Sequence, residues 1–326
     1  MAESFNLPDF DSLPKVEGMP QGCAWGVFDK DGQKDRIGCL NLLTPRVIQE
    51  ALKEAYDGVS ISLNWPIGAL KKPGFLRKGL EHKVTSFKAS PFNFHGFDDE
   101  VAFNTQCSSQ WDSLLHFAHQ PTKKSYNDVQ PTLEQLIQDF DNVDRDKALP
   151  TLNHWHDRGG LVGRGILLDY REYAQVKGIE YSCFSNHAIT VQELEDIAKH
   201  QGTELRHGDI IIIRTGYTED LGNASTEEQE HMLGTNKSVG VKGCKESAKW
   251  FWNRHFSAVA GDTLGFEQIP SRIEEEDNRE GHISELGQCP LLLSSAIKEF
   301  YVILFRCKCD GLAQGQGILG AQSLGI

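Results

Sequence analysis

A run of four isoleucines within HGDIIIIRTGY (residues 207–217) constrains the fold of this chain more than any other feature of its sequence. A half-exposed strand alternates apolar and polar side chains, whereas an unbroken apolar run of this length is typical of a strand buried on both faces. LVGRGILLDY (161–170) is a second short apolar run, and SAVAGDT (257–263) predicts a third strand. We therefore expect the core to be built around a sheet.

Helix signals separate these predicted strands. ITVQELEDIAKHQG (189–202) contains a capping box, in which Thr190 accepts from the Glu193 amide and the Glu193 side chain reaches back to Thr190. KESAKWFWNRHF (245–256) predicts a second helix. The order strand, helix, strand, helix, strand from 161 to 263 predicts an α/β fold with a mixed central sheet.

The N-terminal half has a looser pattern. Thr44 and Pro45 are the cap and first residue of a predicted helix, and Gly58 stops it. The elements predicted in this half are a helix over 39–58, a strand over 59–67 and a helix over 131–142.

The domain organisation follows from the absence of any low-complexity linker. Residues 1–35 mix Pro, Gly and Asp, and we expect them to form an arm on the surface of one domain that spans 36–326. The tail after residue 290 is its most divergent part.

Charge and composition exclude some classes of partner. The 326 residues carry a formal net charge of −13, which disfavours binding to nucleic acid or to an anionic membrane surface. The sequence has no apolar run as long as a membrane span, and its first residues lack a secretory signal. Its eight cysteines are scattered and are expected to be reduced thiols. We therefore expect a cytoplasmic protein with a small-molecule ligand.

The stretch NTQCSSQWDSLLHFAHQ (104–120) has the strongest chemical signal. Gln106, Gln110, Asp112 and His116 follow one another at separations of 4, 2 and 4 residues. This spacing is typical of metal ligands, yet glutamine is a weak ligand compared with histidine. The pattern leaves two alternatives open, a metal site with weak donors or a site that works without a metal.

Several segments together resemble the cyclase family of metal-dependent hydrolases, which includes bacterial kynurenine formamidase and isatin hydrolase, and the match is closest to its fungal branch. The resemblance covers roughly residues 24–290 and implies a single-domain swivelling β/β/α cyclase-like fold. The segments that carry it are GCLNLLTPRVIQEALKEAYDGVSISLNWPI, NTQCSSQWDSLLHFAHQPTKKSYN, RGGLVGRGILLDY, ITVQELEDIAKHQG, HGDIIIIRTGY and AVAGDTLGFE.

The resemblance also implies roles for the residues of the 104–120 stretch. Gln106 and Gln110 stand where the family has two metal-binding histidines, and Asp112 stands at its bridging aspartate. His116 matches the histidine that moves protons, and Glu285 matches a metal-binding glutamate near the C-terminus. With amides in place of imidazoles, the site is expected to hold Mn²⁺, Mg²⁺ or Zn²⁺ weakly, or to hold no metal.

Five further residues are candidates for substrate binding. Trp111 and Phe117 supply aromatic surface, with a plain core role as the alternative. His187 precedes a capped helix, and Asp262 and Glu267 follow a predicted strand, where ligands gather in α/β folds.

The basic stretch KKPGFLRKG (71–79) is either a solvated loop or a flap that attracts an anionic substrate.

Three functions remain open at this point. The first is a kynurenine-formamidase-like hydrolase of an amide, lactam or lactone bond in an aromatic or cyclic small molecule. The second is a metal-free cyclase, isomerase or dehydratase of secondary metabolism that uses Asp112 and His116. The third is a catalytically silent small-molecule binding protein. The resemblance also implies a homodimer or homotetramer.

Overall fold

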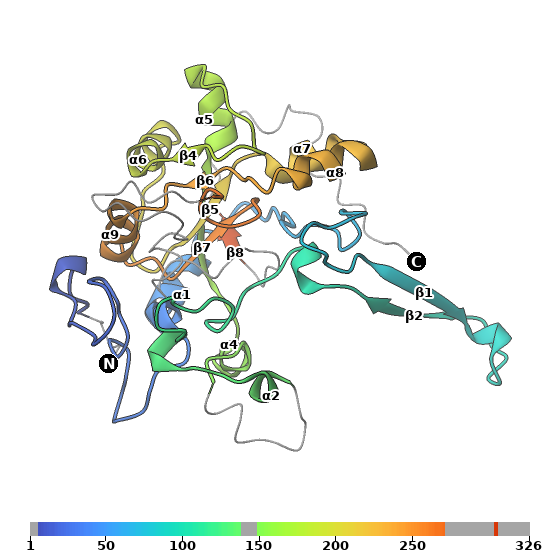
Figure 1. Ribbon diagram of the computed structural model, residues 1–326, viewed down its shortest axis with the longest axis horizontal. Coiled ribbons are helices and arrows are strands. Elements are labelled where there is room, and N and C mark those ends of the chain that lie inside the picture. Colours follow the sequence, from blue (N-terminus) through green and yellow to red (C-terminus); the bar gives the residue numbers. More distant parts are fainter. Residues whose placement is uncertain (1–5, 138–148, 271–302, 306–326) are drawn as a thin grey trace.

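The computed structural model describes residues 6–137, 149–270 and 303–305. Its centre is a four-stranded sheet in the order β7–β5–β3–β8, and its described pairs are all parallel. Helices lie on both sides of this sheet (Figure 1). Its strands are β3 (Gly163–Asp169), β5 (Ile210–Arg214), β7 (Ala258–Gly261) and β8 (Ile303–Phe305).

The four isoleucines form β5, as the sequence predicts, and none is more than 8% exposed. Ile211 and Ile213 belong to one hydrophobic cluster, while Ile210 and Ile212 belong to another. Successive side chains of a strand point to opposite faces, so the two clusters lie on opposite faces of the sheet. The prediction of a strand buried on both faces is confirmed.

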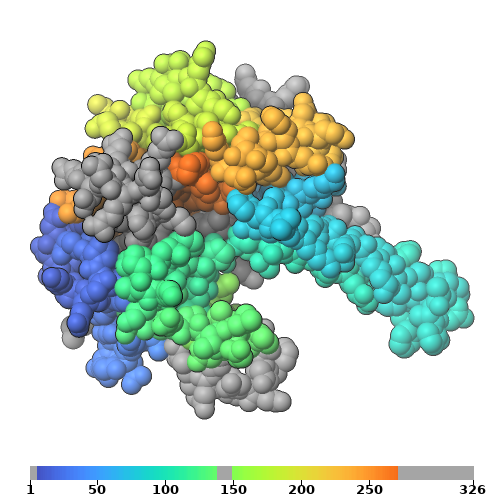
Figure 2. All heavy atoms as spheres, viewed as in Figure 1, coloured from blue at the N-terminus to red at the C-terminus, as the bar shows by residue number. Residues whose placement is uncertain are grey.

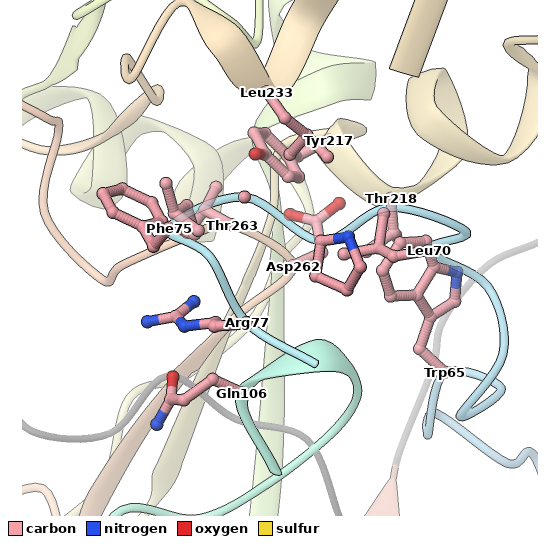
Figure 3. Close-up of a pocket in the computed structure, with 13 residues that line it drawn as sticks. Trp65, Leu70, Phe75, Arg77, Gln106, Tyr217, Thr218, Leu233, Asp262 and Thr263 are labelled. Atoms are coloured by element: carbon pink, nitrogen blue, oxygen red, sulfur yellow. The ribbon is translucent and has the colours of Figure 1, made fainter. Parts of the chain in front are cut away.

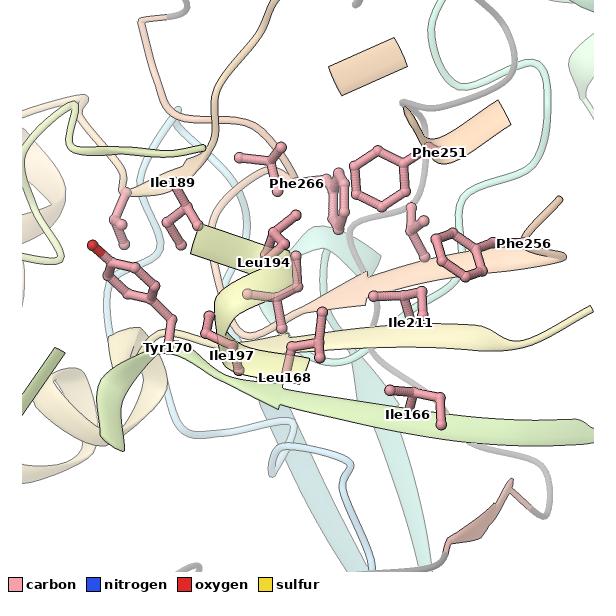
Figure 4. Close-up of a cluster of buried hydrophobic side chains, with 14 of the residues drawn as sticks. Ile166, Leu168, Tyr170, Ile189, Leu194, Ile197, Ile211, Phe251, Phe256 and Phe266 are labelled. Atoms are coloured by element: carbon pink, nitrogen blue, oxygen red, sulfur yellow. The ribbon is translucent and has the colours of Figure 1, made fainter. Parts of the chain in front are cut away.

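The larger cluster fills the space between the sheet and helices α6 (Val191–His200) and α9 (Lys245–Asn253). Leu194 and Phe251 of these helices pack over Leu168 and Ile211 of the strands (Figure 4). Each such side chain contributes about 1.5–3 kcal/mol when it is removed from water. Both predicted helices are thus held mainly by their apolar faces.

The start of α6 has the predicted capping box. The Thr190 hydroxyl accepts from the Glu193 amide at 3.2 Å, and the Glu193 carboxylate accepts from the Thr190 amide at 2.8 Å. The opposite face of the sheet is covered by the second cluster, to which Leu40, Leu43 and Trp155 contribute.

The predicted elements of the N-terminal half are only partly correct. Thr44 does cap a helix that begins at Pro45, but this helix, α1, ends at Leu52 instead of Gly58. The residues before it form a short 3-10 helix, Gly38–Leu42. The predicted helix over 131–142 begins with a capping box at Thr132, and its described part is α2 (Leu133–Leu136). Residues 138–148 lie outside the described part of the chain.

The strand predicted over 59–67 is wrong. These residues pair with no neighbouring strand in the described chain, and Val59 and Ile61 are 76% and 60% exposed. An alternating pattern specifies a strand only where a partner strand accepts its backbone hydrogen bonds.

Several elements carry no clear signal in the sequence. α5 and α7 directly follow β3 and the loop after β5, and β4 pairs with β6 in parallel. Their bounds are α4 (Asn153–Asp157), α5 (Tyr170–Lys177), α7 (Tyr217–Asn223), α8 (Thr226–Gly234), β4 (Ala188–Ile189) and β6 (Gly240–Val241). Short 3-10 helices span Phe10–Ser12, Phe87–Ala89, Thr105–Cys107 and Tyr126–Asp128.

The antiparallel pair β1 (Glu81–Ser86) and β2 (Phe97–Ala102), which we call the ribbon, projects from the body of the molecule (Figures 1 and 2). Val84, Phe97 and Val101 lie on one of its faces and are 50–60% exposed. The other face is polar and includes the Lys83–Glu100 ion pair.

The described N-terminal residues lie against α9. The Phe10 amide donates to Asn253, and the Trp252 indole donates to the Pro8 carbonyl, both at 2.8 Å. Phe10 is buried in the larger cluster. Within the described residues, no helix combines the length and the apolar character needed to cross a bilayer.

Candidate active site

Three of the side chains singled out in the sequence lie around the carboxylate of a fourth, Asp112. Asp112 is 6% exposed, and its Oδ1 accepts from the amide nitrogens of Gln106 at 3.0 Å and Gln110 at 2.9 Å. His116 Nδ1 lies 3.6 Å from the same oxygen, and 41% of the histidine side chain is exposed. The structure therefore gathers a carboxylate, two amide donors and a solvent-accessible imidazole at one place.

The segment that carries this cluster is tied to the loop that contains Trp65 and Lys78. Ser108 donates to the Trp65 carbonyl at 2.7 Å, and the Asn104 amide donates to the Lys78 carbonyl at 2.9 Å. The Asn104 side chain also accepts a hydrogen bond from the backbone amide of Gln106 and so caps the start of the 3-10 helix Thr105–Cys107. These bonds fix Gln106 relative to the 65–78 loop.

A pocket lies between this loop and the ends of β5 and β7 (Figure 3). Gln106 is part of its wall and links it to Asp112, whereas Gln110, Asp112 and His116 do not line the pocket. Three of its residues are aromatic. The lining residues are Trp65, Leu70, Pro73, Gly74, Phe75, Arg77, Gln106, Tyr217, Thr218, Leu233, Asp262, Thr263 and Leu264.

Asp262 is the acidic side chain of this pocket and stands directly after β7. Its carboxylate accepts from the Thr215 amide at 2.7 Å, the Thr215 hydroxyl at 2.8 Å and the Gly216 amide at 2.8 Å. Burial raises the pKa of Asp262, and these hydrogen bonds oppose that rise. Gly216 has a φ of +86°, a conformation that suits glycine and that turns the chain from β5 into α7.

Glu267, the other strand-end candidate, does not line the pocket. Its Oε1 is buried and has no hydrogen-bond partner among the described residues, and burial raises the pKa of Glu267 to about 8. At neutral pH the favoured form is therefore a neutral carboxylic acid.

The remaining candidates also lie outside the pocket wall. Trp111 packs edge-on against Trp155 at a centroid distance of 5.7 Å and contacts the second hydrophobic cluster. Phe117 is partly buried. His187 Nε2 is 2.6 Å from the Tyr170 hydroxyl, its ring stacks on Tyr181, and burial lowers the pKa of His187. The contacts described for Trp111 and His187 are with the protein's own core and polar network.

Most residues of the pocket wall have no feature in the sequence that predicts a role in a site. Phe75 and Arg77 come from the basic stretch 71–79, for which a flap over the site was one of the two alternatives. Tyr217 and Thr218 follow β5, so the strand-end rule that selected Asp262 would have selected them too.

The described residues do not fit a divalent metal. In residues 6–137, 149–270 and 303–305, no three His, Cys, Asp or Glu side chains are grouped as ligands. Gln106 and Gln110 turn their amide nitrogens toward Asp112, and an N–H group cannot ligate a cation. These donors suit a hydrogen-bonded carboxylate. Glu285 lies outside the described residues.

Residues 48–268 match the model of the family described as "Putative cyclase", which is more than half of the chain. The chain belongs to the cyclase family. The resemblance drawn from the sequence is thereby confirmed.

A solved cyclase structure supports the cyclase-like α/β fold. A crystal structure described as a novel cyclase has 23% sequence identity and a TM-score of 0.66, covering 84% of this chain and 86% of its own. Isatin hydrolase A from Ralstonia solanacearum has 10% identity and a TM-score of 0.43, covering 75% of this chain and 79% of its own. No curated protein matched the chain.

Proposed function

We propose that this cyclase-family protein is an enzyme that cleaves a C–N or C–O bond next to a carbonyl group in a small aromatic or cyclic molecule, with lactams, lactones and activated amides as the substrate class. The observation that carries the proposal is the convergence of Gln106, Gln110 and His116 on Asp112, beside a pocket that Gln106 also lines.

The geometry suggests a general acid–base mechanism. His116 Nδ1 lies 3.6 Å from Asp112, so a proton on this nitrogen would face the carboxylate and leave Nε2 as the base. The base takes a proton from water while the water oxygen attacks the carbonyl carbon. His116 then gives the proton to the leaving nitrogen or oxygen. Such proton transfer contributes a rate factor of about 10²–10⁴.

The two glutamines hold Asp112 in place for this role. A buried carboxylate is costly unless donors surround it, and the two amides donate at 2.9 and 3.0 Å. They do so without adding positive charge that would compete with the imidazolium formed on His116. Asp112, 3.6 Å from His116 Nδ1, is placed to orient and stabilise that ring.

A second candidate uses the same pair for ring closure, isomerisation or dehydration. It is favoured by the donor geometry around Asp112, because acid–base chemistry on an activated substrate needs no Lewis acid. Hydrolysis of an unstrained arylformamide, the kynurenine-formamidase-like activity, is the most demanding member of the proposed class.

The test is a substrate panel that comprises an aryl formamide, an aromatic five-membered lactam and an aromatic lactone. Products are followed by mass spectrometry with chelator and with added Mn²⁺. We expect turnover of at least the lactam or lactone, and a loss of about 10²–10⁴ in His116→Ala. His156→Ala, an exposed histidine on α4, is the matched control and keeps full turnover.

Two outcomes contradict the proposal. Full turnover in His116→Ala removes this residue from the mechanism. Binding of panel compounds without any product, by hydrolysis, ring closure or dehydration, makes the protein a binding protein instead of an enzyme.

A further inference from the structure

We propose that the pocket recognises molecules that carry a carboxylate, and that Arg77 binds this group. The inference takes from the proposed function only that the pocket is the substrate site. Its prediction concerns binding, which is measured without turnover.

Among the described residues, Arg77 is a cation without a counter-charge. Its guanidinium lies 5.1 Å from the ring centroid of Phe75, and the side chain is half-buried in the pocket wall. No hydrogen bond or ion pair joins Arg77 to another side chain in the part of the chain that the structure describes. A guanidinium has five donors, so this one is free to bind an anion.

Other partly buried arginines of the protein have polar partners, which are carboxylates for Arg171 and Arg214 and the carbonyls of Gly160 and Leu43 for Arg158. Arg171 lies 2.7 Å from Asp220, and Arg214 lies 2.9 Å from Asp169. Arg77 therefore differs from these arginines, because its guanidinium has no polar partner among the described residues. A half-buried guanidinium that contacts only an aromatic ring is more economically explained by a ligand than by packing.

The other charges at the pocket do not neutralise Arg77. Asp262 is the acidic group in the wall, and its oxygens are already bonded to Thr215 and Gly216. Burial raises the pKa of Asp262, and the hydrogen bonds from Thr215 and Gly216 oppose that rise. In Figure 3, Arg77 and Gln106 lie together at one end of the pocket, and Asp262 and Tyr217 lie at the other.

The basic stretch 71–79 explains how an acidic protein admits an anion. The chain has a net charge of −13, which repels anions at long range. Lys72 and Lys78 pair with Glu230 and Glu81, at 2.5 and 2.7 Å, whereas Arg77 turns into the pocket wall. The ligand expected is thus a flat molecule with a carboxylate at the Arg77 end and an N–H or O–H donor toward Asp262.

The experiment compares acids with their neutral amides. Benzoate, phenylacetate and 1-naphthoate are titrated into the full-length protein by calorimetry, beside the three primary amides. A charge-assisted arginine–carboxylate contact predicts that at least one acid binds about ten- to a hundredfold more tightly than its amide. Raising the salt concentration weakens the acid and not the amide.

Arg77→Gln removes this preference and Arg77→Lys keeps part of it, because the lysine retains the charge without the bidentate geometry. Lys71→Gln is the matched control, since Lys71 is exposed on the same loop and does not line the pocket. Equal affinity of every acid and its amide overturns the inference, as does an acid preference that survives Arg77→Gln.

This result separates the two proposals. If acids bind through Arg77 but no panel compound is turned over, the enzymatic function fails and the inference stands. If turnover depends on His116 while acids and amides bind equally, only the inference fails.

Discussion

Replacing Glu267 by glutamine should change how the stability of the protein depends on pH. Within the described part of the chain, the Glu267 Oε1 is buried without a hydrogen-bond partner, and burial raises the pKa of this carboxyl from 4.5 to about 8. Because the folded-state pKa lies above the unfolded value, the folded protein holds the proton more tightly. Glu267 therefore lowers the free energy of unfolding progressively from about pH 4.5 to about pH 8, and the cost levels off above that.

The size of this effect follows from the shift. A difference of about 3.5 pH units, at about 1.4 kcal/mol each, gives at most ~5 kcal/mol. A glutamine fills the same space and does not ionise. We expect Glu267→Gln to match the wild type near pH 4.5 and to be more stable at pH 8 by an amount that approaches this limit.

Urea denaturation at half-unit intervals from pH 4.5 to 9 measures the difference in the free energy of unfolding between variant and wild type. Glu180→Gln, at an exposed position, is the control and should give a flat difference. A flat difference for Glu267→Gln would refute the assignment of a buried neutral acid. Because Glu267 lies outside the pocket wall, the variant should also keep wild-type turnover.

Three further predictions concern other parts of the molecule. Arg164→Met leaves the Asp209 carboxylate, which pairs with Arg164 at 2.9 Å, without this partner in the interior. Urea denaturation should therefore show that the free energy of unfolding falls by about 3–5 kcal/mol, and a fall below about 1 kcal/mol would contradict this. If copies associate through the ribbon face that carries Val84, Phe97 and Val101 beside the His82–Asp99 pair, Phe97→Ser with Val101→Thr should sediment as a monomer and the wild type as a dimer or tetramer. Equal sedimentation argues against that interface. Asp262→Asn turns an N–H donor toward the N–H donors of Thr215 or Gly216, so the melting temperature of the protein should fall. An unchanged melting temperature would show that these hydrogen bonds contribute little to stability.

The central sheet was predictable from the sequence because its signals are local. Four consecutive isoleucines cannot be satisfied on one face of a strand, and the Thr190–Glu193 capping box begins α6 wherever the helix packs. The ribbon was not predictable. Its strands EHKVTS and FDDEVA contain mostly exposed polar side chains, so they lack the apolar alternation that indicates a strand.

The candidate site was likewise predictable only where its sequence signals are local. The grouping of Gln106, Gln110, Asp112 and His116 came from spacing and family resemblance, which place neighbours in sequence at one locus. The pocket wall joins residues from the 65–78 loop with residues that follow β5 and β7, more than 130 positions away. Only tertiary packing brings Arg77 and Asp262 to one cavity.

The effect of Gln106→Glu on kcat/KM, measured with and without Mn²⁺, is the most direct test of whether Gln106 acts as a hydrogen-bond donor to Asp112 in the catalytic site. If the Gln106 amide donates to Asp112, the change sets two carboxylates against each other. We then expect kcat/KM to fall by at least about tenfold at pH 8, and we expect that Mn²⁺ does not restore it. A variant that binds Mn²⁺ and gains activity would contradict this, because Gln106 would then occupy a ligand position instead of a donor position.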